Sequence, residues 1–265
     1  MSAAVDRTLA IASNTFREAV RNRAFIGLMI LAIAFLFFSL VLSELAVRGE
    51  KVRVILDFGY FAVGLFGVVI AVVMGVILVY KEIEKKTIFT IIPKPIHRFE
   101  IIVGKYLGMT ALLILEVGLM AVVWLLALWL KDAPISWDIL KSLILIFCEI
   151  LMVASVAILF SSFSSPILSG IFTIGIFVIG RVVHMVDQML NARRGLFVDV
   201  PALRPFGEVL VAVVPDLQVF NVTQDLLLNL PVSTSYVVAS IGYAVAYIVC
   251  FISLAVILFQ RRDFI

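Results

Sequence analysis

Three ionisable residues, Glu116, Glu149 and Arg181, lie inside long apolar stretches of the sequence. A charged group at the middle of a membrane-spanning helix costs about 2.5–3.5 kcal/mol, so such residues usually face a bundle interior or a cavity. Pairing Glu149 with Arg181, or Glu116 with Arg181, would reduce this cost. The three residues can therefore form a polar patch along a path through the membrane. The structural alternatives are a simple ion pair, a protonated glutamate hydrogen-bonded between helices, or an Arg181 that extends to the outer interface.

A second group of charged side chains lies in residues 81–108, KEIEKKTIFTIIPKPIHRFEIIVGKYLG, the most charged part of the chain. Glu82 precedes Lys86 by four residues, which is the favourable order for an ion pair on a helix. Apolar residues recur between the charges. The pattern predicts a short amphipathic helix here.

Two prolines interrupt this segment. Pro93 and Pro95 flank Lys94, and the residue before each proline is biased away from helix. We expect a rigid elbow, followed by a second helix that begins near residues 96–97 and returns to the membrane. A plain connection needs only a few residues, so the length favours a docking surface for a partner. The alternative is a basic loop held at lipid headgroups.

Metal, nucleotide and nucleic-acid sites are not indicated. His184 with Asp187, and Met185 with Met189, share one helix end, but two such residues are too few ligands for zinc or copper. The pair Gly104-Lys105 lacks the earlier glycine and the Ser or Thr of a phosphate-binding loop. The aromatic residues form no stacking cluster for nucleic acid. We therefore expect no metal and no cofactor in this chain.

The elements that must position these residues follow from the composition. Of 265 residues, 63% are hydrophobic and only 15% are charged, against about half and a quarter in soluble domains. About 20 apolar residues cross a bilayer as a helix. The sequence predicts an all-α polytopic membrane protein, one transmembrane domain over 1–265, with six spans. They are residues 24–45, 58–80, 106–130, 139–160, 167–183 and 236–259.

The remaining segments and the charge distribution suggest an orientation. The pattern of residues 3–22 predicts a basic amphipathic helix that lies along the inner membrane interface. Residues 184–235 should lie outside the cytoplasm, with short re-entrant or interfacial helices. If the N-terminus is cytoplasmic, twelve of the 21 Lys and Arg residues lie inside and eight outside, with Arg181 in a span. Positive charge favours the inner side, so both termini and the region 81–105 should be cytoplasmic.

Three stretches resemble a known family. EIEKKTIFTIIPKPIHRFEIIVGKYLG is similar to the cytoplasmic coupling region of ABC-2-type transporter permeases, and the ending FQRRDFI resembles their usual terminus. VVPDLQVFNV, residues 213–222, resembles more narrowly the permeases associated with multicopper-enzyme maturation, including the nitrous oxide reductase maturation permease. The positions that match the coupling region are Glu82, Glu84, Lys85, Thr87, Lys94-Pro95, Arg98 and Gly104-Lys105-Tyr106.

The resemblance implies a transport subunit without its own nucleotide site. A separate ATP-binding cassette ATPase, carrying ATP and Mg²⁺, would contact the coupling region, and a second permease copy would complete a dimer in the inner membrane of a prokaryote. Membrane lipid and a periplasmic accessory protein are further expected partners, and export is the expected direction. The helix of the coupling region would move as a lever, and Ile88, Phe89 and Ile92 would be its buried contacts. The residues expected to couple to the ATPase are Glu82, Glu84, Lys85, Lys86, Thr87, Pro93, Lys94, Pro95, Arg98 and Lys105.

Two other classes of protein remain open on sequence grounds. An ion-coupled carrier or channel could use Glu116 and Glu149 as proton sites, but it leaves the charged docking segment unexplained. An intramembrane enzyme needs a converging set of catalytic groups, and the chain has neither H-E-x-x-H nor G-x-S-x-G.

Overall fold

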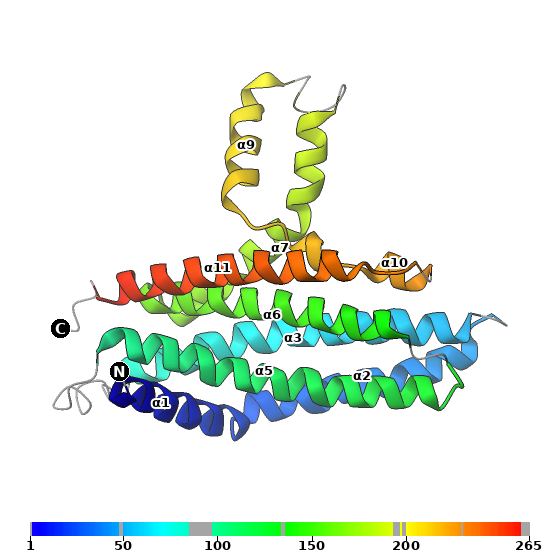
Figure 1. Ribbon diagram of the computed structural model, residues 1–265, viewed down its shortest axis with the longest axis horizontal. Coiled ribbons are helices and arrows are strands. Elements are labelled where there is room, and N and C mark those ends of the chain that lie inside the picture. The colour runs from blue at the N-terminus through cyan, green and yellow to red at the C-terminus, as the bar shows by residue number, and fades with distance from the viewer. Residues whose placement is uncertain are drawn as a thin grey trace.

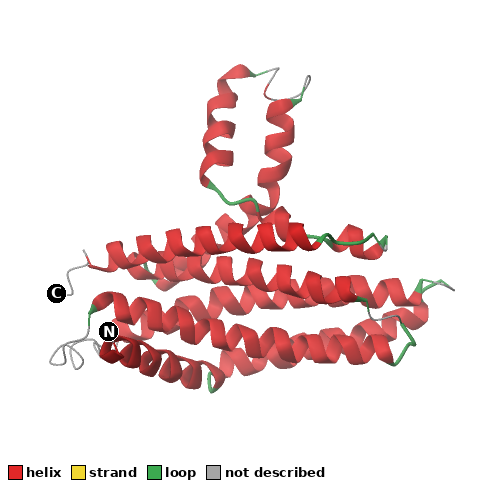
Figure 2. Cartoon of the chain, viewed as in Figure 1, coloured by secondary structure: helices red, strands yellow, loops and turns green. Residues whose placement is uncertain are grey.

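A computed structural model describes residues 2–47, 50–84, 97–133, 136–192, 197, 200–228 and 230–260. These residues form helices and connecting loops, and no strand occurs among them (Figure 2). Six helices are long and apolar enough to cross a membrane, which confirms the predicted polytopic all-α class. They are α2 (Arg23–Leu45), α3 (Lys51–Glu84), α5 (Arg98–Trp129), α6 (Trp137–Phe163), α7 (Pro166–Asn191) and α11 (Thr234–Gln260).

Several helices extend beyond the apolar runs from which they were predicted. Helix α3 begins at Lys51, before the run 58–80, and α7 continues to Asn191, beyond the run 167–183. The reason is physical: hydropathy marks the part of a helix that lies in hydrocarbon, whereas i to i−4 hydrogen bonding continues through polar residues. The sequence therefore underestimates helix length at polar ends.

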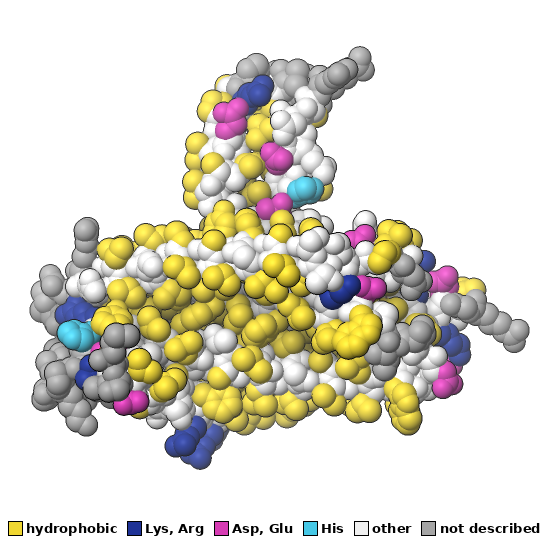
Figure 3. Space-filling model, in the orientation of Figure 1, with side chains coloured by type: hydrophobic (Ala, Val, Ile, Leu, Met, Phe, Trp, Pro, Cys, Tyr) yellow, Lys and Arg dark blue, Asp and Glu magenta, His cyan; other side chains and the backbone are white. Residues whose placement is uncertain are grey.

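The spans lie side by side in an elongated bundle, and both chain termini lie at the same end (Figure 1). Apolar side chains cover the middle of the bundle in Figure 3, while charged side chains gather near its two ends. A continuous buried core links α3, α5 and α6, with Trp124 of α5 fully buried. The Trp124 Nε1 atom donates a hydrogen bond to the Ile55 carbonyl of α3 over 3.0 Å.

Glycines on α3 allow its neighbours to approach closely. A Cβ atom at Gly59 would lie 1.9 Å from Nε1 of Trp124, and one at Gly67 would lie 2.1 Å from Cδ1 of Ile150. Glycine at these positions lets the Trp124 and Ile150 side chains lie directly against the backbone of α3. These contacts bring α5 and α6 close to α3.

The remaining elements are short, except for α1 (Ser2–Val20) at the N-terminus. Between α7 and α11 the chain forms η1 (Pro201–Leu203), α9 (Arg204–Val213), η2 (Leu217–Phe220) and α10 (Thr223–Leu227). The pair Arg204–Val213 and Leu217–Leu227 is bent by 47°, as in a broken span or a re-entrant loop. Helix α9 and the end of α7 stand side by side and project from the long side of the bundle (Figure 1).

Candidate functional site

The start of α5, which lies inside the predicted coupling region 81–105, is tied to α1 by an ion pair. Arg7 of α1 donates to both carboxylate oxygens of Glu100, with Nη2 to Oε1 at 2.7 Å and Nε to Oε2 at 2.9 Å. Hydrogen bonding to Glu100 raises the pKa of Arg7. A bidentate arginine–carboxylate pair fixes relative orientation as well as distance. The ion pair therefore holds α1 against the first turn of α5.

Two basic residues tie the same part of α5 to other spans. Arg98 Nη1 donates to the Phe259 and Gln260 carbonyls at 3.3 and 3.0 Å. These carbonyls end α11, where helix carbonyls have no partner within the helix and cations are favoured. Lys105 is 2% exposed, and its Nζ donates to the Leu78 carbonyl of α3. The start of α5 thus contacts α1, α3 and α11 through charged side chains.

The motif Gly104-x-x-x-Gly108 brings α1 onto α5. A Cβ atom at Gly108 would lie 2.5 Å from the Ala12 carbonyl oxygen, and one at Gly104 would lie 2.8 Å from Cγ2 of Ile11. Ala12 is buried in this contact, whereas Leu9 is exposed. The α1 face that packs on the bundle is therefore formed largely by small side chains. The location of α1 at a membrane interface stays a prediction.

The predicted ATPase-coupling residues fall into two groups. Glu82 and Glu84 belong to the last turn of α3, while Arg98 and Lys105 make the contacts given above. The others lie outside the described residues, so their helix, elbow and docking role stay predictions. They are Lys85, Lys86, Thr87, Pro93, Lys94 and Pro95, together with Ile88, Phe89 and Ile92.

Inside the bundle, Arg181 of α7 pairs with Glu149 of α6. The Nη2 atom donates to Oε2 at 2.9 Å, and Nε lies 2.9 Å from Oε1. Glu149 is 1% exposed, while the Arg181 side chain is 28% exposed and lies near the ring of Phe177. The structure therefore has the first of the two pairings considered from the sequence. Glu116 is buried separately, and neither of its carboxylate oxygens has a hydrogen-bond partner among the described residues.

A cavity of about 360 Å³ lies beside this ion pair. Its polar lining includes one guanidinium, two carboxylates, one amide and two hydroxyls, within largely apolar walls. Such a surface suits the polar group of an amphipathic molecule. The residues that line it are Asp57, Tyr60, Phe61, Gly64, Leu65, Ile146, Glu149, Phe177, Arg181, Asn221 and Thr223.

Sequence reasoning missed part of this lining. Asp57 and Thr223 lie outside the six predicted spans, and no local pattern connects either with Arg181. Asn221 belongs to the stretch VVPDLQVFNV, which was noticed only for its resemblance. Glu116, although predicted beside Arg181 as an alternative, is not part of the lining.

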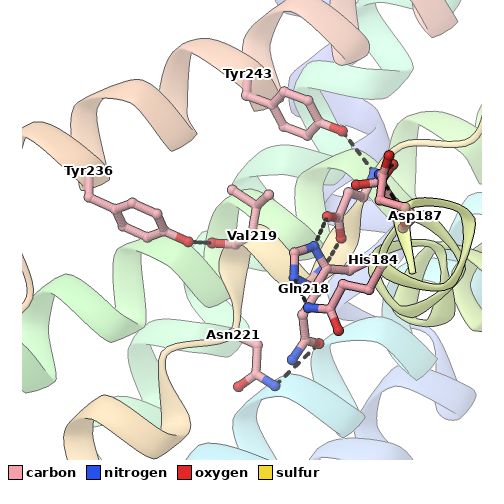
Figure 4. A network of polar contacts seen from close by, with 10 residues as sticks. His184, Asp187, Gln218, Val219, Asn221, Tyr236 and Tyr243 are labelled. Carbon is pink, nitrogen blue, oxygen red and sulfur yellow. Dashed lines mark hydrogen bonds and ion pairs between the residues drawn. The ribbon is translucent and has the colours of Figure 1, made fainter. Parts of the chain in front are cut away.

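A network of polar contacts holds the segment between α9 and α10 against the spans (Figure 4). The Asp216 backbone N–H donates to the Tyr243 hydroxyl at 2.8 Å, and the Tyr236 hydroxyl donates to the Val219 carbonyl at 2.5 Å. His184 Nδ1 lies 3.2 Å from Asp216 Oδ2. His184 therefore faces Asp216 rather than Asp187, and no group of three metal-ligating residues occurs in the part of the chain that the structure describes.

Tyr60 anchors the same segment from α3. Its hydroxyl donates to the Phe220 carbonyl at 3.0 Å and accepts from the Val222 N–H at 3.2 Å. We expect Tyr60→Phe to destabilise the protein by about 1–3 kcal/mol, because both backbone groups lose a buried partner. Thermal unfolding and hydrogen exchange of residues 219–223 measure the effect. Tyr236→Phe is the control: its hydroxyl is exposed, water can replace it, and an equal loss would contradict the role given to Tyr60.

The fold and these contacts define a class: a polytopic helical membrane protein with a polar cavity among its spans and a charged contact network at one end. The chain belongs to the ABC-2 family transporter proteins, whose family model matches residues 9–264. Membership makes it the membrane subunit of an ABC transporter, a family that in general works with an ATP-binding cassette partner. No match was found among the curated proteins.

Proposed function

We propose that this chain is the permease of an ATP-driven exporter, which acts as a homodimer with a separate ATPase beneath each half. The observation that carries the proposal is the course of α3. This helix runs without interruption from Asp57 and Tyr60, which line the cavity, to Glu84, inside the predicted coupling region 81–105. A displacement of the coupling segment would therefore move one wall of the cavity.

The contacts at the start of α5 give the proposed coupling a physical route. When the ATPase closes, the region 81–105 would be pulled or pushed as a lever. Lys105 would pass the motion to α3, Arg98 to α11, and Glu100 to α1, because each contact crosses between helices. ATP and Mg²⁺ belong to the partner ATPase in this proposal. Lys85, Lys86 and Lys94 would set charge complementarity at its surface.

The proposed orientation puts both termini and the coupling segment in the cytoplasm of a prokaryote, with the protein in its inner membrane. Two observations support it: the termini lie at one end of the bundle (Figure 1), and the excess of Lys and Arg falls on that side. In this orientation the predicted extracytoplasmic segment 184–235 includes the end of α7 and α9, which project from the long side of the bundle, and α10, which lies near the outer end (Figure 1). The resemblance of residues 213–222 to maturation permeases supports an exported factor for a periplasmic metalloenzyme, received by a periplasmic accessory protein.

Co-purification with the partner tests the proposal. We expect the chain, isolated from its native membrane, to carry a protein with a phosphate-binding GxxxxGK[ST] loop and ATPase activity. Lys85→Glu together with Lys86→Glu should reduce that association by about tenfold or more, since charge reversal opposes docking. The control is Arg53→Glu, which reverses an exposed charge at the other end of α3. Transport that persists without any ATPase would refute the proposal.

A further inference from the structure

The charges that line the cavity do not balance. Arg181 is paired with Glu149, so the charge of the guanidinium and the charge of that carboxylate offset each other. Asp57 of α3 is the third charged residue of the lining, and it is exposed. Its side chain has no hydrogen bond or ion pair with any part of the chain that the structure describes. The cavity therefore has a net negative charge.

The hydroxyl groups of the lining are already hydrogen-bonded within the protein. The Tyr60 hydroxyl lies between the Phe220 carbonyl and the Val222 N–H. The Thr223 hydroxyl donates to Asn221 Oδ1 at 2.7 Å, and the same oxygen accepts from the Thr223 N–H at 3.2 Å. Both hydroxyl protons are therefore directed at protein acceptors rather than at a molecule in the cavity.

The polar atoms that stay open are acceptors. Besides the Asp57 carboxylate, Glu149 Oε1 is buried and has no hydrogen-bond partner among the described residues. Arg181 Nε lies 2.9 Å from this oxygen, so the contact is an ion pair without a directed hydrogen bond. A buried acceptor that lacks a donor is costly. A ligand that brings both donors and positive charge would match the lining of the cavity.

The remaining walls suit an organic cation rather than a metal ion. Phe61 is exposed, Phe177 is half-buried, and both line the cavity with Leu65. Aromatic faces attract cations, and the Arg181 guanidinium already lies 5.6 Å from the centre of the Phe177 ring. Two carboxylates are too few ligands for a metal ion, and no group of three metal-ligating side chains occurs in the described ranges.

We propose that the cavity binds an organic ammonium group attached to an apolar body. The inference rests on the proposed export function, whose substrate class it would define. Asp57, in the second turn of α3, lies toward the end of the bundle opposite the two termini (Figure 1), so the ammonium binds in that half of the protein. An anionic group would meet the Asp57 carboxylate and would compete with Glu149 for Arg181. The ammonium can belong to a lipid headgroup or to a free amphipathic amine.

Three probes with the same apolar body test the charge preference: 4-phenylbutylamine, which is an ammonium at neutral pH, 4-phenylbutyrate and 4-phenylbutanol. Binding of the radiolabelled probes to the purified full chain is measured in nanodiscs of digalactosyldiacylglycerol, an uncharged lipid, with empty nanodiscs subtracted. We expect the amine to bind about tenfold more tightly than the carboxylate or the alcohol, because only the amine gains a favourable charge interaction. Equal affinities, tighter binding of the carboxylate, or no binding of the amine would overturn the proposal.

Substitution of Asp57 assigns the preference to the cavity. Asp57→Asn keeps the size of an exposed side chain and removes its charge, so it should weaken binding of the amine by about tenfold and leave the alcohol unchanged. The matched control is Asp225→Asn, which removes an exposed carboxylate of α10 that does not line the cavity. An Asp57→Asn variant with undiminished amine affinity, or equal losses in the two variants, would contradict the role of the cavity.

The lipid of the nanodisc distinguishes the two sources of the ammonium. Phosphatidylethanolamine that competes with 4-phenylbutylamine would indicate a lipid headgroup, and undiminished binding in its presence would indicate a free amine; both results support an ammonium site. Failure of the amine to bind a chain that still co-purifies with its ATPase would overturn the cation site and leave the proposed function intact. Amine binding by a chain that has no ATPase partner would instead count against the proposed function.

Discussion

Arg181→Leu should destabilise the protein by about 3–5 kcal/mol, because it leaves the Glu149 carboxylate buried without its partner. Glu149 is 1% exposed, and Arg181 nitrogens lie 2.9 Å from each of its two carboxylate oxygens. The double change Glu149→Leu with Arg181→Leu should recover most of this loss, since well-packed apolar residues can replace a buried ion pair at little cost. Thermal unfolding in detergent of the wild type, both single variants and the double variant gives the coupling energy directly.

The same four proteins separate a structural pair from a functional one. If the pair only holds α6 to α7, transport by the double variant should recover together with stability. If the guanidinium takes part in handling the exported molecule, as its place in the cavity wall suggests, the double variant should be stable and inactive. Equal destabilisation by the single and double changes would show that the two residues are not energetically paired.

Gly108→Ala should lower stability by about 1–3 kcal/mol and loosen α1, because the added Cβ atom meets backbone at 2.5 Å. The Ala12 carbonyl cannot rotate away as a side chain could, so α1 must shift from α5. Hydrogen exchange of α1 and thermal unfolding measure the two effects. A transport defect larger than the stability loss would indicate that α1 takes part in coupling through Glu100.

Gly118→Ala, on the same helix, is the matched control. No atom lies within 4 Å of a Cβ built at that position. The substitution should be neutral or stabilising by about 0.5–1 kcal/mol, because alanine loses less conformational freedom than glycine in a helix. If the two alanine substitutions behave alike, close packing of α1 on Gly108 is not important for stability.

Some features of the site were partly accessible from the sequence. The spacing of Gly104 and Gly108 indicated a close helix approach, but it did not identify α1 as the neighbour. The depth of Glu149 and Arg181 indicated that a partner was needed, but Glu116 satisfied the same criterion. In both cases the local sequence indicated that a contact was needed. It did not identify the helix or residue that supplies the contact.

Local properties of the sequence are sufficient to predict the class of the protein and the number of its spans. Apolar runs of about 20 residues must form helices in lipid, because every backbone N–H and C=O needs a partner within the segment. The charge bias suggested an orientation, and the segment 81–105 indicated a family. These are local properties, so a linear reading can detect them.

The tertiary structure decided which side chains meet. In the folded protein Arg181 pairs with Glu149 rather than with Glu116. Lys105 is buried and donates to the Leu78 carbonyl, and Arg98 donates to the carbonyls of Phe259 and Gln260. The fold also turned the end of α7 out of the bundle, where it lies beside α9 (Figure 1). These contacts join residues far apart in the chain, and they depend on how helices rotate and cross, which hydropathy and spacing do not encode.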